Sequence, residues 1–477
     1  MAKQPMLKFV DVSRDMPEKR APNLRNQDFH EIYAEYADAK AREQASRCSQ
    51  CGVPYCQNHC PLHNNIPDWL RLTAEGRLQE AYDLSQATNT FPEICGRICP
   101  QDRLCEGNCV IETAGHGTVT IGAVEKYITD TAWEQGWVKP ATPAYERPES
   151  VAIIGAGPGG LAAADVLRRA GVQVTVYERS DRGGGLMTYG IPGFKLEKDV
   201  VMRRIDQLAQ GGVNFVLNCA VGQDIGFDDL RRKHDAVMIA TGVYKSQDLQ
   251  FPDTGAQGVV RAIDYLTASN RRSFGDRVPE FDSGALNAKG KRVVVIGGGD
   301  TAMDCVRTAI RQGATSVKCL YRRDRANMPG SQREVANAEE EGVVFEWLST
   351  PKGLSGDPVH GVCVQKMRLG APDATGRQSP ELIEGAEYEE PADLVIKALG
   401  FAPEDIPTLW GQPDLEVTSW GTIRAEFTSG RTAMDGVFAV GDIVRGASLV
   451  VWAIRDGRDA AAAVLDYLGE TRAVAAQ

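Results

Sequence analysis

Residues 151–160 read VAIIGAGPGG, in which a short apolar strand pattern runs directly into a glycine-rich turn. An alanine-rich helical segment, Leu161 to Arg169, follows it, and a second β-branched segment runs from Val172 to Tyr177. A strand, a G-x-G-x-x-G turn, a helix and a further strand in this order are typical of a βαβ unit that binds a dinucleotide. This stretch therefore predicts a Rossmann-like α/β fold.

Single residues of this unit have expected roles at the turn. Gly155 permits the tight turn, Gly157 lets the backbone approach a pyrophosphate, and Gly160 allows the helix to pack closely. The amino terminus of the helix offers unpaired N–H groups and a positive dipole end to phosphates. Glu178 lies 18 residues past Gly160, at the end of the next strand, where a carboxylate accepts hydrogen bonds from ribose hydroxyls.

The same texture recurs from Arg292 to Ile296, from Thr301 to Arg311 and from Ser316 to Tyr321. The turn between the first two of these segments reads Gly297-Gly-Gly299-Asp-Thr-Ala, with alanine in the last position. The chain therefore carries two nucleotide-binding folds in series.

The two copies differ in the residue that follows the second strand. Arg322 and Arg323 stand in the second copy where Glu178 stands in the first. A guanidinium suits a 2′-phosphate that a carboxylate would repel, so the second site is expected to prefer NADPH to NADH. A solvated basic loop is the alternative interpretation.

Eight of the 12 cysteines form two groups with the spacings C-x2-C-x4-C-x3-C-P and C-x3-C-P-x4-C-x3-C. Eight thiolates match the demand of two 4Fe–4S clusters, and in two-cluster ferredoxins the cysteine before proline binds the other cluster. Cys60 is therefore expected to cross to the second cluster, and structural zinc is the alternative. The remaining cysteines are expected to be small buried apolar side chains: Cys219, Cys305, Cys319 and Cys363.

Composition and charge exclude several classes of partner. The net charge of −11 and the isoelectric point near 5.3 leave no basic face for nucleic acid. No stretch approaches the roughly 18 uninterrupted apolar residues of a membrane span, and residues 1–10 contain no apolar core of signal-peptide length. We expect a cytoplasmic protein that binds neither membrane nor nucleic acid.

The opening third predicts short helices. Apolar residues recur at helical spacing behind Asp28 as far as Ala37, and Pro67 is placed to begin a helix that runs through Leu78. A third helix is expected around Ile121 to Ile128. Three prolines then break the pattern, so a linker is expected at Lys139 to Ser150.

A third strand pattern, GVFAVGD, runs from Gly436 to Asp442, and a helix is expected from about Ser448 through Tyr467. Here the sequence resembles the two-dinucleotide flavoprotein reductases, in which such a Gly-Asp contacts the ribityl and phosphate region of the flavin. The resemblance implies that the first βαβ unit binds FAD and that the second is an inserted NADPH domain. Two segments look like the crossover turns of that family: Ala240-Thr241-Gly242 and Ala398-Leu399-Gly400.

The expected fold class is therefore α/β, with an N-terminal helical iron–sulfur domain followed by two Rossmann-like domains. The helical domain is expected to span residues 1–145. The FAD domain is expected in two parts, 146–245 and 403–477, with the NADPH domain inserted between them at 246–402.

The cysteine module ahead of a flavoprotein resembles the small (beta) subunits of bacterial NADPH-dependent glutamate synthases and the amino-terminal half of dihydropyrimidine dehydrogenase. Three segments carry the resemblance, Arg47 to Cys56, Cys60 to Asp68 and Ala132 to Pro140, and it covers essentially the whole chain. It implies an electron-entry subunit, which oxidises NADPH at FAD and passes electrons through two 4Fe–4S clusters. The acceptor would be a large subunit carrying FMN, which makes L-glutamate from 2-oxoglutarate and L-glutamine. Hydride transfer to the flavin is direct, so no catalytic acid or base is expected.

Three other functions are compatible with these motifs. A stand-alone NADPH–ferredoxin-type oxidoreductase and the electron-transfer subunit of another multisubunit reductase would both keep the two nucleotide sites and the clusters. A nucleotide sensor stapled by zinc would have no enzymatic activity.

The resemblance also implies the cofactor ligands. Glu125, 16 residues past Cys109, is expected to complete the second cluster in preference to Cys95. The first cluster would be held by Cys48, Cys51, Cys56 and Cys109, and the second by Cys60, Cys99, Cys105 and Glu125. The expected FAD residues are Gly155, Ala156, Gly157, Pro158, Gly159, Gly160, Glu178, Arg179, Gly185, Leu186, Val221, Thr241, Gly242, Gly441, Asp442, Ser448, Leu449 and Val450. The expected NADPH residues are Gly297, Gly299, Asp300, Thr301, Ala302, Arg322, Arg323, Ala398, Leu399 and Gly400.

Overall fold

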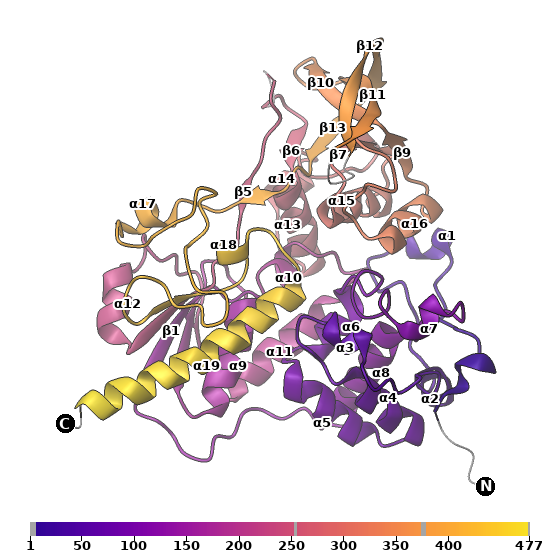
Figure 1. Ribbon diagram of the computed structural model, residues 1–477. Helices are drawn as coiled ribbons and strands as arrows, with labels where there is room; N and C mark the ends of the chain where they lie inside the picture. The colour runs from indigo at the N-terminus through magenta and orange to yellow at the C-terminus, as the bar shows by residue number, and fades with distance from the viewer. Residues whose placement is uncertain (1–5, 252–254, 374–377, 476–477) are drawn as a thin grey trace.

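The computed structural model describes residues 6–251, 255–373 and 378–475. Figure 1 shows a helical amino-terminal part and two parallel sheets, each flanked by helices. The long helix α19 (Val450–Ala475) crosses the part that contains the first sheet. The expected fold class, a helical domain followed by two Rossmann-like units of which the second is inserted in the first, is confirmed.

The amino-terminal part consists of short helices around a small apolar core. Trp69, Tyr82, Val124 and Ile128 fill this core and are at most 1% exposed. The helix expected around Ile121 to Ile128 is present as α8. The helices are η1 (Lys8–Val10), α1 (Pro22–Arg25), α2 (Asp38–Ala45), α3 (Tyr55–Asn58), α4 (Ile66–Glu75), α5 (Leu78–Thr88), α6 (Pro92–Ile98), α7 (Val110–Thr113) and α8 (Ile121–Glu134).

The helix expected behind Asp28 is wrong. Residues 29–37 contain no helix, and α2 begins only at Asp38. Tyr33 instead forms an isolated antiparallel bridge with Lys19, and the Tyr36 hydroxyl donates to the carbonyl of Asp15 at 2.6 Å. Pairing with the preceding segment overrides the helical spacing of the apolar residues, because propensity is a weak constraint beside tertiary contacts.

The helix expected from Pro67 through Leu78 is two helices. Helix α4 ends at Glu75, Gly76 adopts the left-handed φ of +78°, and α5 begins at Leu78. A glycine in this conformation is a common end of a helix. The linker expected from Lys139 is present, since residues 139–149 form neither helix nor strand.

The first sheet has the strand order β15-β4-β1-β2-β3, and all neighbours are parallel. Its strand β15 follows the second sheet in the sequence, so the chain leaves the first sheet, builds the second and returns. Helix α19 then packs on α9, where a Cβ on Gly457 would lie 2.1 Å from the carbonyl oxygen of Gly159. The elements are β1 (Ser150–Ile154), α9 (Pro158–Arg169), β2 (Gln173–Tyr177), β3 (Asn214–Val216), β4 (Ala236–Ile239) and β15 (Val437–Ala439).

The second sheet has the order β6-β13-β7-β8-β9 and is also parallel. A three-stranded antiparallel sheet, β10-β11-β12, projects beyond it (Figure 1). The chain passes from the first parallel sheet to the second through β5 and returns through β14, and these two strands pair antiparallel. The strands are β5 (Lys245–Ser246), β6 (Val259–Arg261), β7 (Arg292–Ile296), β8 (Ser316–Tyr321), β9 (Val344–Trp347), β10 (Ser349–Ser355), β11 (Gly361–Pro372), β12 (Gln378–Pro391), β13 (Leu394–Lys397) and β14 (Phe401–Ala402).

The remaining helices belong to the parts of the chain that contain the two parallel sheets. They are α10 (Leu186–Tyr189), α11 (Lys198–Gln210), α12 (Phe227–Lys233), α13 (Ala262–Ser273), α14 (Pro279–Asp282), α15 (Asp300–Arg311), α16 (Gln332–Glu340), α17 (Ile406–Trp410) and α18 (Asp442–Arg445). Within the described ranges, none of the helices has the length and apolar character needed to cross a membrane. Of the four isolated cysteines, Cys305 and Cys319 are buried as expected, whereas Cys219 and Cys363 are only partly buried.

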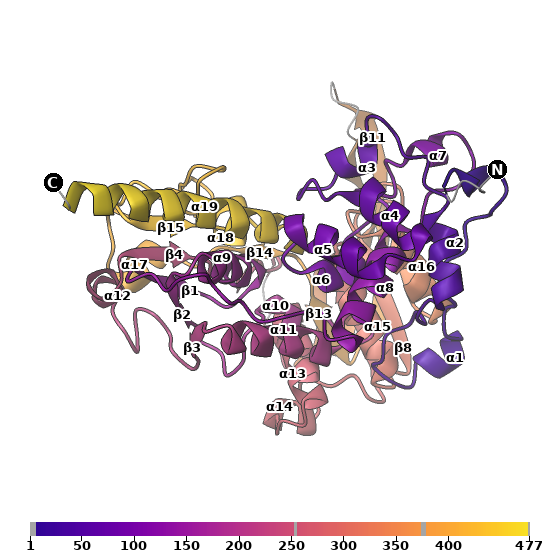
Figure 2. The same cartoon turned by 90° about the horizontal axis from the view of Figure 1, so that it is seen from below.

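Buried ion pairs join the helical part to the helices of the second sheet. Arg25 Nε lies 2.9 Å from Glu341 Oε1, and Arg307 and Arg311 contact the same carboxylate at 2.8 and 2.6 Å. The four side chains are fully buried. Figure 2 shows the result, with the helical part lying against α15 and α16.

Candidate functional site

The first glycine-rich turn connects β1 to α9. Gly155 adopts φ +106°, and a Cβ there would lie 2.4 Å from the carbonyl oxygen of Ala240, so no larger residue fits. Gly157 is the opposite case, because no heavy atom lies within 4 Å of a Cβ built on it. Gly157 instead lines a cavity of about 360 Å³. The turn therefore presents open backbone and a helix amino terminus to that cavity, as phosphate binding requires.

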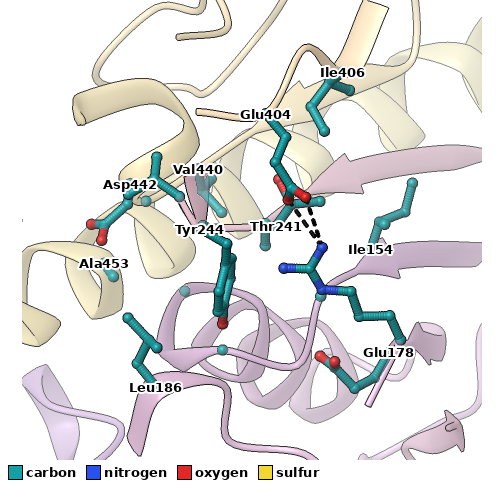
Figure 3. Close-up of a pocket in the computed structure, with 18 of the residues that line it drawn as sticks. Ile154, Glu178, Leu186, Thr241, Tyr244, Glu404, Ile406, Val440, Asp442 and Ala453 are labelled. Carbon is teal, nitrogen blue, oxygen red and sulfur yellow. Dashed lines mark hydrogen bonds and ion pairs between the residues drawn. The ribbon is translucent and has the colours of Figure 1, made fainter. Parts of the chain in front are cut away.

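The cavity lies above the carboxyl ends of β1, β2 and β4 and is closed by residues that follow β14 and β15 (Figure 3). All expected FAD residues line it except Ala156, Gly160 and Gly185, which stand behind its wall. The Ala156 N–H donates to Glu178, and a Cβ on Gly160 would lie 2.2 Å from the carbonyl oxygen of Gly155. The structure thus gathers residues from three distant parts of the sequence around one space.

Three polar groups in the cavity wall suit a dinucleotide. Glu178 is 7% exposed and accepts 2.8 Å hydrogen bonds from the N–H groups of Ala156 and Ser180, which fixes its carboxylate at the end of β2. Thr241 Oγ1 is buried and has no hydrogen-bond partner among the described residues. Burial raises the pKa of Asp442 to about 7. An unpaired buried hydroxyl is costly, so it points to a ligand that supplies the missing partner.

The sequence did not identify every residue of this wall. Arg179 lies 3.0 Å from the carboxylate of Glu404, and its guanidinium lies 4.4 Å from the centre of the Tyr244 ring. Figure 3 shows that Tyr244 and Glu404 line the cavity together with Glu178. Tyr244 follows the crossover turn at Gly242, and Glu404 follows the one at Gly400. Their closeness to these turns is the sequence signal that could have identified them.

The second glycine-rich turn connects β7 to α15 and repeats the backbone of the first. Gly297 adopts φ +147°, and a Cβ there would lie 2.2 Å from the carbonyl oxygen of Ala398. The Cβ position of Gly299 again has no heavy atom within 4 Å. The other expected residues of this site occupy the start of α15, Thr301 and Ala302, and the turn after β13, Leu399 and Gly400.

Two arginines follow β8 near this turn. Arg322 is exposed, and Arg323 is partly buried with an Nε that no described residue pairs. The two guanidinium groups therefore remain available for an anion, in contrast to Arg325, which pairs with Glu339 at 2.9 Å. This arrangement suits the 2′-phosphate that the sequence predicted.

A second cavity of about 240 Å³ lies where the three parts of the molecule meet. The helical part contributes Cys99 and Pro100, the second Rossmann-like unit contributes Asp300 and Thr301, and the first contributes Phe194. The two cavities share the wall residues Leu186, Ser448, Leu449 and Val450. No sequence signal indicated that Arg333, Lys195 and Glu334 would also line this space.

The cysteines of the helical part are buried or partly buried and separate into two groups, and none forms a disulfide. In the first group, burial together with the nearby thiols of Cys48 and Cys109 raises the pKa of Cys56 to about 12. Burial likewise raises the pKa of Cys48 to about 11, with Cys109 and Cys51 acting in the same direction. Cys109, which is distant in sequence from Cys48, Cys51 and Cys56, therefore lies near them, as expected for the first cluster.

The second group combines thiols with a carboxylate. Burial, with smaller contributions from Glu125 and Cys95, raises the pKa of Cys60 to about 12. A hydrogen bond with Cys95 and burial raise the pKa of Cys99, and burial together with Glu106, Cys60 and Glu125 raises that of Cys105. Cys60 thus lies with the second group, whereas the cysteines that precede it in the sequence, Cys48, Cys51 and Cys56, lie in the first.

Glu125 and Cys95 both belong to this second group. Glu125 Oε1 accepts hydrogen bonds from the side-chain amides of Asn64 and Asn89, at 3.0 and 3.2 Å, and burial raises its pKa to about 8. Glu125 raises the pKa of Cys60, Cys99 and Cys105, whereas Cys95 raises the pKa of Cys60 and Cys99. The donor set therefore offers one more candidate ligand than a cluster needs.

A single metal ion needs a tighter arrangement than these groups have. Across the parts of the chain that the structure describes, no three His, Cys, Asp or Glu side chains converge on one point. Tetrahedral zinc takes four ligands at about 2.0 to 2.3 Å from the ion. Among the described residues, the side chains as they stand therefore form no preassembled site for a single ion.

Comparison with known families divides the chain at the same place as the fold does. A family model described as dihydropyrimidine dehydrogenase domain II, 4Fe-4S cluster, matches residues 25–137. A model described as pyridine nucleotide-disulphide oxidoreductase matches residues 149–457. A solved structure of FprA from Mycobacterium tuberculosis in complex with NADPH superposes with a TM-score of 0.58 at 21% identity, covering 69% of this chain and 86% of that one, and so shares the fold.

Two curated relatives match over nearly their whole length. The glutamate synthase (NADPH) small chain of Azospirillum brasilense is 65% identical over 468 residues, which cover 98% of this chain and 97% of the relative. The protein of the same description from Escherichia coli is 46% identical over 471 residues, covering 98% and 99% of the two chains.

Proposed function

The chain belongs to the family of glutamate synthase (NADPH) small chains, and on this premise we propose that it is the electron-entry subunit of a glutamate synthase. It is an NADPH-dependent flavoprotein oxidoreductase with a 4Fe–4S domain. The proposal adds that electrons leave through two clusters to a large FMN-carrying subunit. That subunit would make L-glutamate from 2-oxoglutarate and L-glutamine.

The cavity of about 240 Å³ carries this proposal. Electron transfer requires the nucleotide, the flavin and the first acceptor to be adjacent. One wall of the cavity belongs to Asp300 and Thr301 at the second glycine-rich turn, and another to Leu449 and Val450 beside the first cavity. The third wall contains Cys99, one of the thiols of the second cysteine group.

The first cavity fits FAD. Bound FAD would accept hydride from NADPH and release electrons singly to the clusters. The chain's own residues would hold it: the amino terminus of α9 and Gly157 would face the pyrophosphate, and Glu178 would accept a hydrogen bond from the ribose. Thr241 Oγ1 would gain the hydrogen-bond partner that it lacks, and Asp442 would contact the ribityl region. None of these side chains needs to move a proton to carbon, so binding and orientation are their whole role.

The second glycine-rich turn would hold NADPH. The amino terminus of α15 faces the nucleotide's pyrophosphate, and Arg322 and Arg323 bind the 2′-phosphate that distinguishes NADPH from NADH. This turn lies in the inserted unit, for which we propose the boundaries 246–402. The helical domain would span 1–145 and the FAD domain 146–245 with 403–477.

The two cysteine groups would hold one cluster each. We assign Cys48, Cys51, Cys56 and Cys109 to the first cluster, and Cys60, Cys99, Cys105 and Glu125 to the second. The carboxylate of Glu125 raises the pKa of all three thiols of its group, which supports Glu125 over Cys95 as the fourth ligand. Cys95 donates to Asn89 Oδ1 and packs in the apolar core beside Phe91 and Ile94, which suits a bystander.

Substitution at these two positions tests the ligand assignment. Glu125→Ala should remove one cluster and lower the iron content from about eight to about four atoms per chain. Cys95→Ser should keep about eight. The opposite pair of results would assign the ligand to Cys95.

The whole proposal is tested by purifying the chain anaerobically together with its large partner. We expect FAD, about eight iron and about eight sulfide per small chain beyond the partner's own content, and bleaching of the flavin by NADPH. Glutamine-dependent oxidation of NADPH with 2-oxoglutarate should require both chains. Zinc in place of iron, or NADPH oxidation that no partner can couple to glutamate formation, would contradict the proposal. A cytoplasmic location is part of it and predicts that both chains fractionate together.

A further inference from the structure

Three consecutive residues between Cys99 and Cys105 contact the nucleotide unit. The amide oxygen of Gln101 accepts a hydrogen bond from Arg333 at 2.9 Å. The carboxylate of Asp102 accepts from the hydroxyl of Ser331 at 3.4 Å, and Arg103 Nη1 donates to the carbonyl of Pro329 at 2.7 Å. The loop that connects two thiols of the second group is therefore bound to residues 329–333.

Residues 329–331 lie directly on the second glycine-rich turn. The N–H of Gly330 donates to the carbonyl of Gly298 at 3.0 Å, and a Cβ on Gly330 would lie 3.1 Å from that oxygen. The N–H of Ser331 donates to Asp300 Oδ1 at 3.0 Å. Arg103 thus reaches the turn at which the nucleotide's phosphates are expected.

Asp300 creates an electrostatic difficulty at this turn. It is the first residue of α15, the position that Pro158 occupies in α9. A carboxylate at the amino terminus of a helix stabilises the helix but repels the phosphates that bind there. Within 4 Å of this carboxylate, Arg103 at 3.8 Å is the only cationic side chain among the described residues.

The guanidinium of Arg103 has binding capacity to spare. Its one hydrogen bond within the described chain uses Nη1, and the side chain is 44% exposed. A guanidinium carries five N–H donors and binds phosphate oxygens in pairs. The group can therefore offset the charge of Asp300 and still donate to a ligand.

We propose that Arg103, a residue of the iron–sulfur domain, binds the pyrophosphate of NADPH and completes the nucleotide site across the domain boundary. The inference rests on the proposed function, in which residues 297–302 bind NADPH. It separates two kinds of arginine at one site: Arg103 recognises the pyrophosphate common to NADPH and NADH, and Arg322 and Arg323 recognise the 2′-phosphate of NADPH alone.

The test compares both nucleotides in the complete complex. For Arg103→Ala, the KM for NADPH and for NADH should each rise about tenfold, with ferricyanide as acceptor, because a charged hydrogen bond to phosphate is lost. The value of kcat at saturation should change little, and Arg103→Lys should recover part of the affinity. Arg71→Ala is the matched control, since Arg71 lies in the same domain, is 40% exposed and, among the described residues, forms ion pairs only with acids of its own helix.

A second variant tests the electrostatic step independently of Arg103. Asp300→Asn keeps the acceptor for the N–H of Ser331 and removes the negative charge, so it should tighten the binding of NADP⁺ and NAD⁺ severalfold.

Unchanged KM values for both nucleotides in Arg103→Ala would overturn the proposal. So would a loss of iron or of thermal stability with unchanged KM, which would mean that Arg103 only packs the domains. If Arg322→Ala and Arg323→Ala also leave NADPH binding unchanged, the proposed nucleotide site itself fails, which is a separate result.

Discussion

The two glycine-rich turns have the same backbone and different surroundings. In each, the first glycine packs against a carbonyl oxygen of a crossover turn, 2.4 Å from the Cβ position in Gly155 and 2.2 Å in Gly297. The glycine two positions further on, Gly157 or Gly299, faces open space. Beyond this frame the sites diverge. The first opens into a cavity of about 360 Å³ closed by the returning carboxyl-terminal segment. The second is bordered by the exposed Arg322 and by Arg323, whose Nε has no partner among the described residues.

This difference separates a retained cofactor from an exchanged substrate. Retention requires walls on several sides, and the first turn obtains them from the segments around Glu404 and Asp442, far away in sequence. Exchange requires access from solvent, and the exposed Arg322 would provide charge for the proposed nucleotide without enclosing it. The backbone thus determines that a dinucleotide binds, while the side chains around it determine which one and for how long.

The largest effects should follow from filling the two equivalent backbone positions. Gly155→Val should prevent the turn from forming against Ala240 and give protein without flavin, because the added atoms meet backbone that cannot move aside. Gly297→Val should give protein that retains flavin but oxidises NADPH at least about 100-fold more slowly. Flavin absorbance and steady-state NADPH oxidation measure the two results.

These two variants also control each other. Both add the same side chain at a left-handed glycine, so a general folding defect would remove the flavin from both. Retention of flavin in Gly155→Val, or its loss in Gly297→Val, would contradict the assignment of the first turn to FAD and the second to NADPH.

A smaller effect is expected where the two sites differ in charge. Replacing Arg322 and Arg323 together by alanine should lower kcat/KM for NADPH about 100-fold and leave that for NADH nearly unchanged, since only NADPH carries the 2′-phosphate. The ratio of the two kcat/KM values, measured at constant ionic strength, reports the change. Arg325→Ala is the control, because Arg325 is paired with Glu339 and should not alter the ratio. An equal loss for both nucleotides would place these arginines elsewhere on the dinucleotide.

The frame of both sites could be predicted from the sequence because it depends on local rules. Glycines at fixed intervals, a strand before them and a helix after them are local requirements, so β7 and β8 have the expected bounds, Arg292–Ile296 and Ser316–Tyr321. The expected sorting of the thiols also used a local rule, the cysteine before proline, and Cys60 lies beside Glu125 and Cys95.

The parts that could not be predicted depend on contacts between distant segments. Apolar residues at helical spacing after Asp28 indicated a helix, but Tyr33 pairs with Lys19 and the segment is extended. The contact of Arg103 with Pro329 joins residues 226 positions apart, and no composition or spacing signals it. Such contacts decide where the three parts meet, which is where electron transfer would take place.

The smallest effect tests the enclosed site through a single hydroxyl. Thr241 Oγ1 is buried beside the first cavity without a partner among the described residues, so it costs stability when the flavin is absent and gains a hydrogen bond when the flavin is bound. Thr241→Val should therefore weaken FAD binding about threefold to tenfold and raise the free energy of unfolding of the flavin-free protein by roughly 1 kcal/mol. Flavin titration and denaturant unfolding measure the two quantities. Weaker FAD binding together with a higher free energy of unfolding would show that the hydroxyl serves the ligand and not the folded protein. If both quantities fall, Thr241 supports the crossover turn of the folded protein and makes no contact with the flavin.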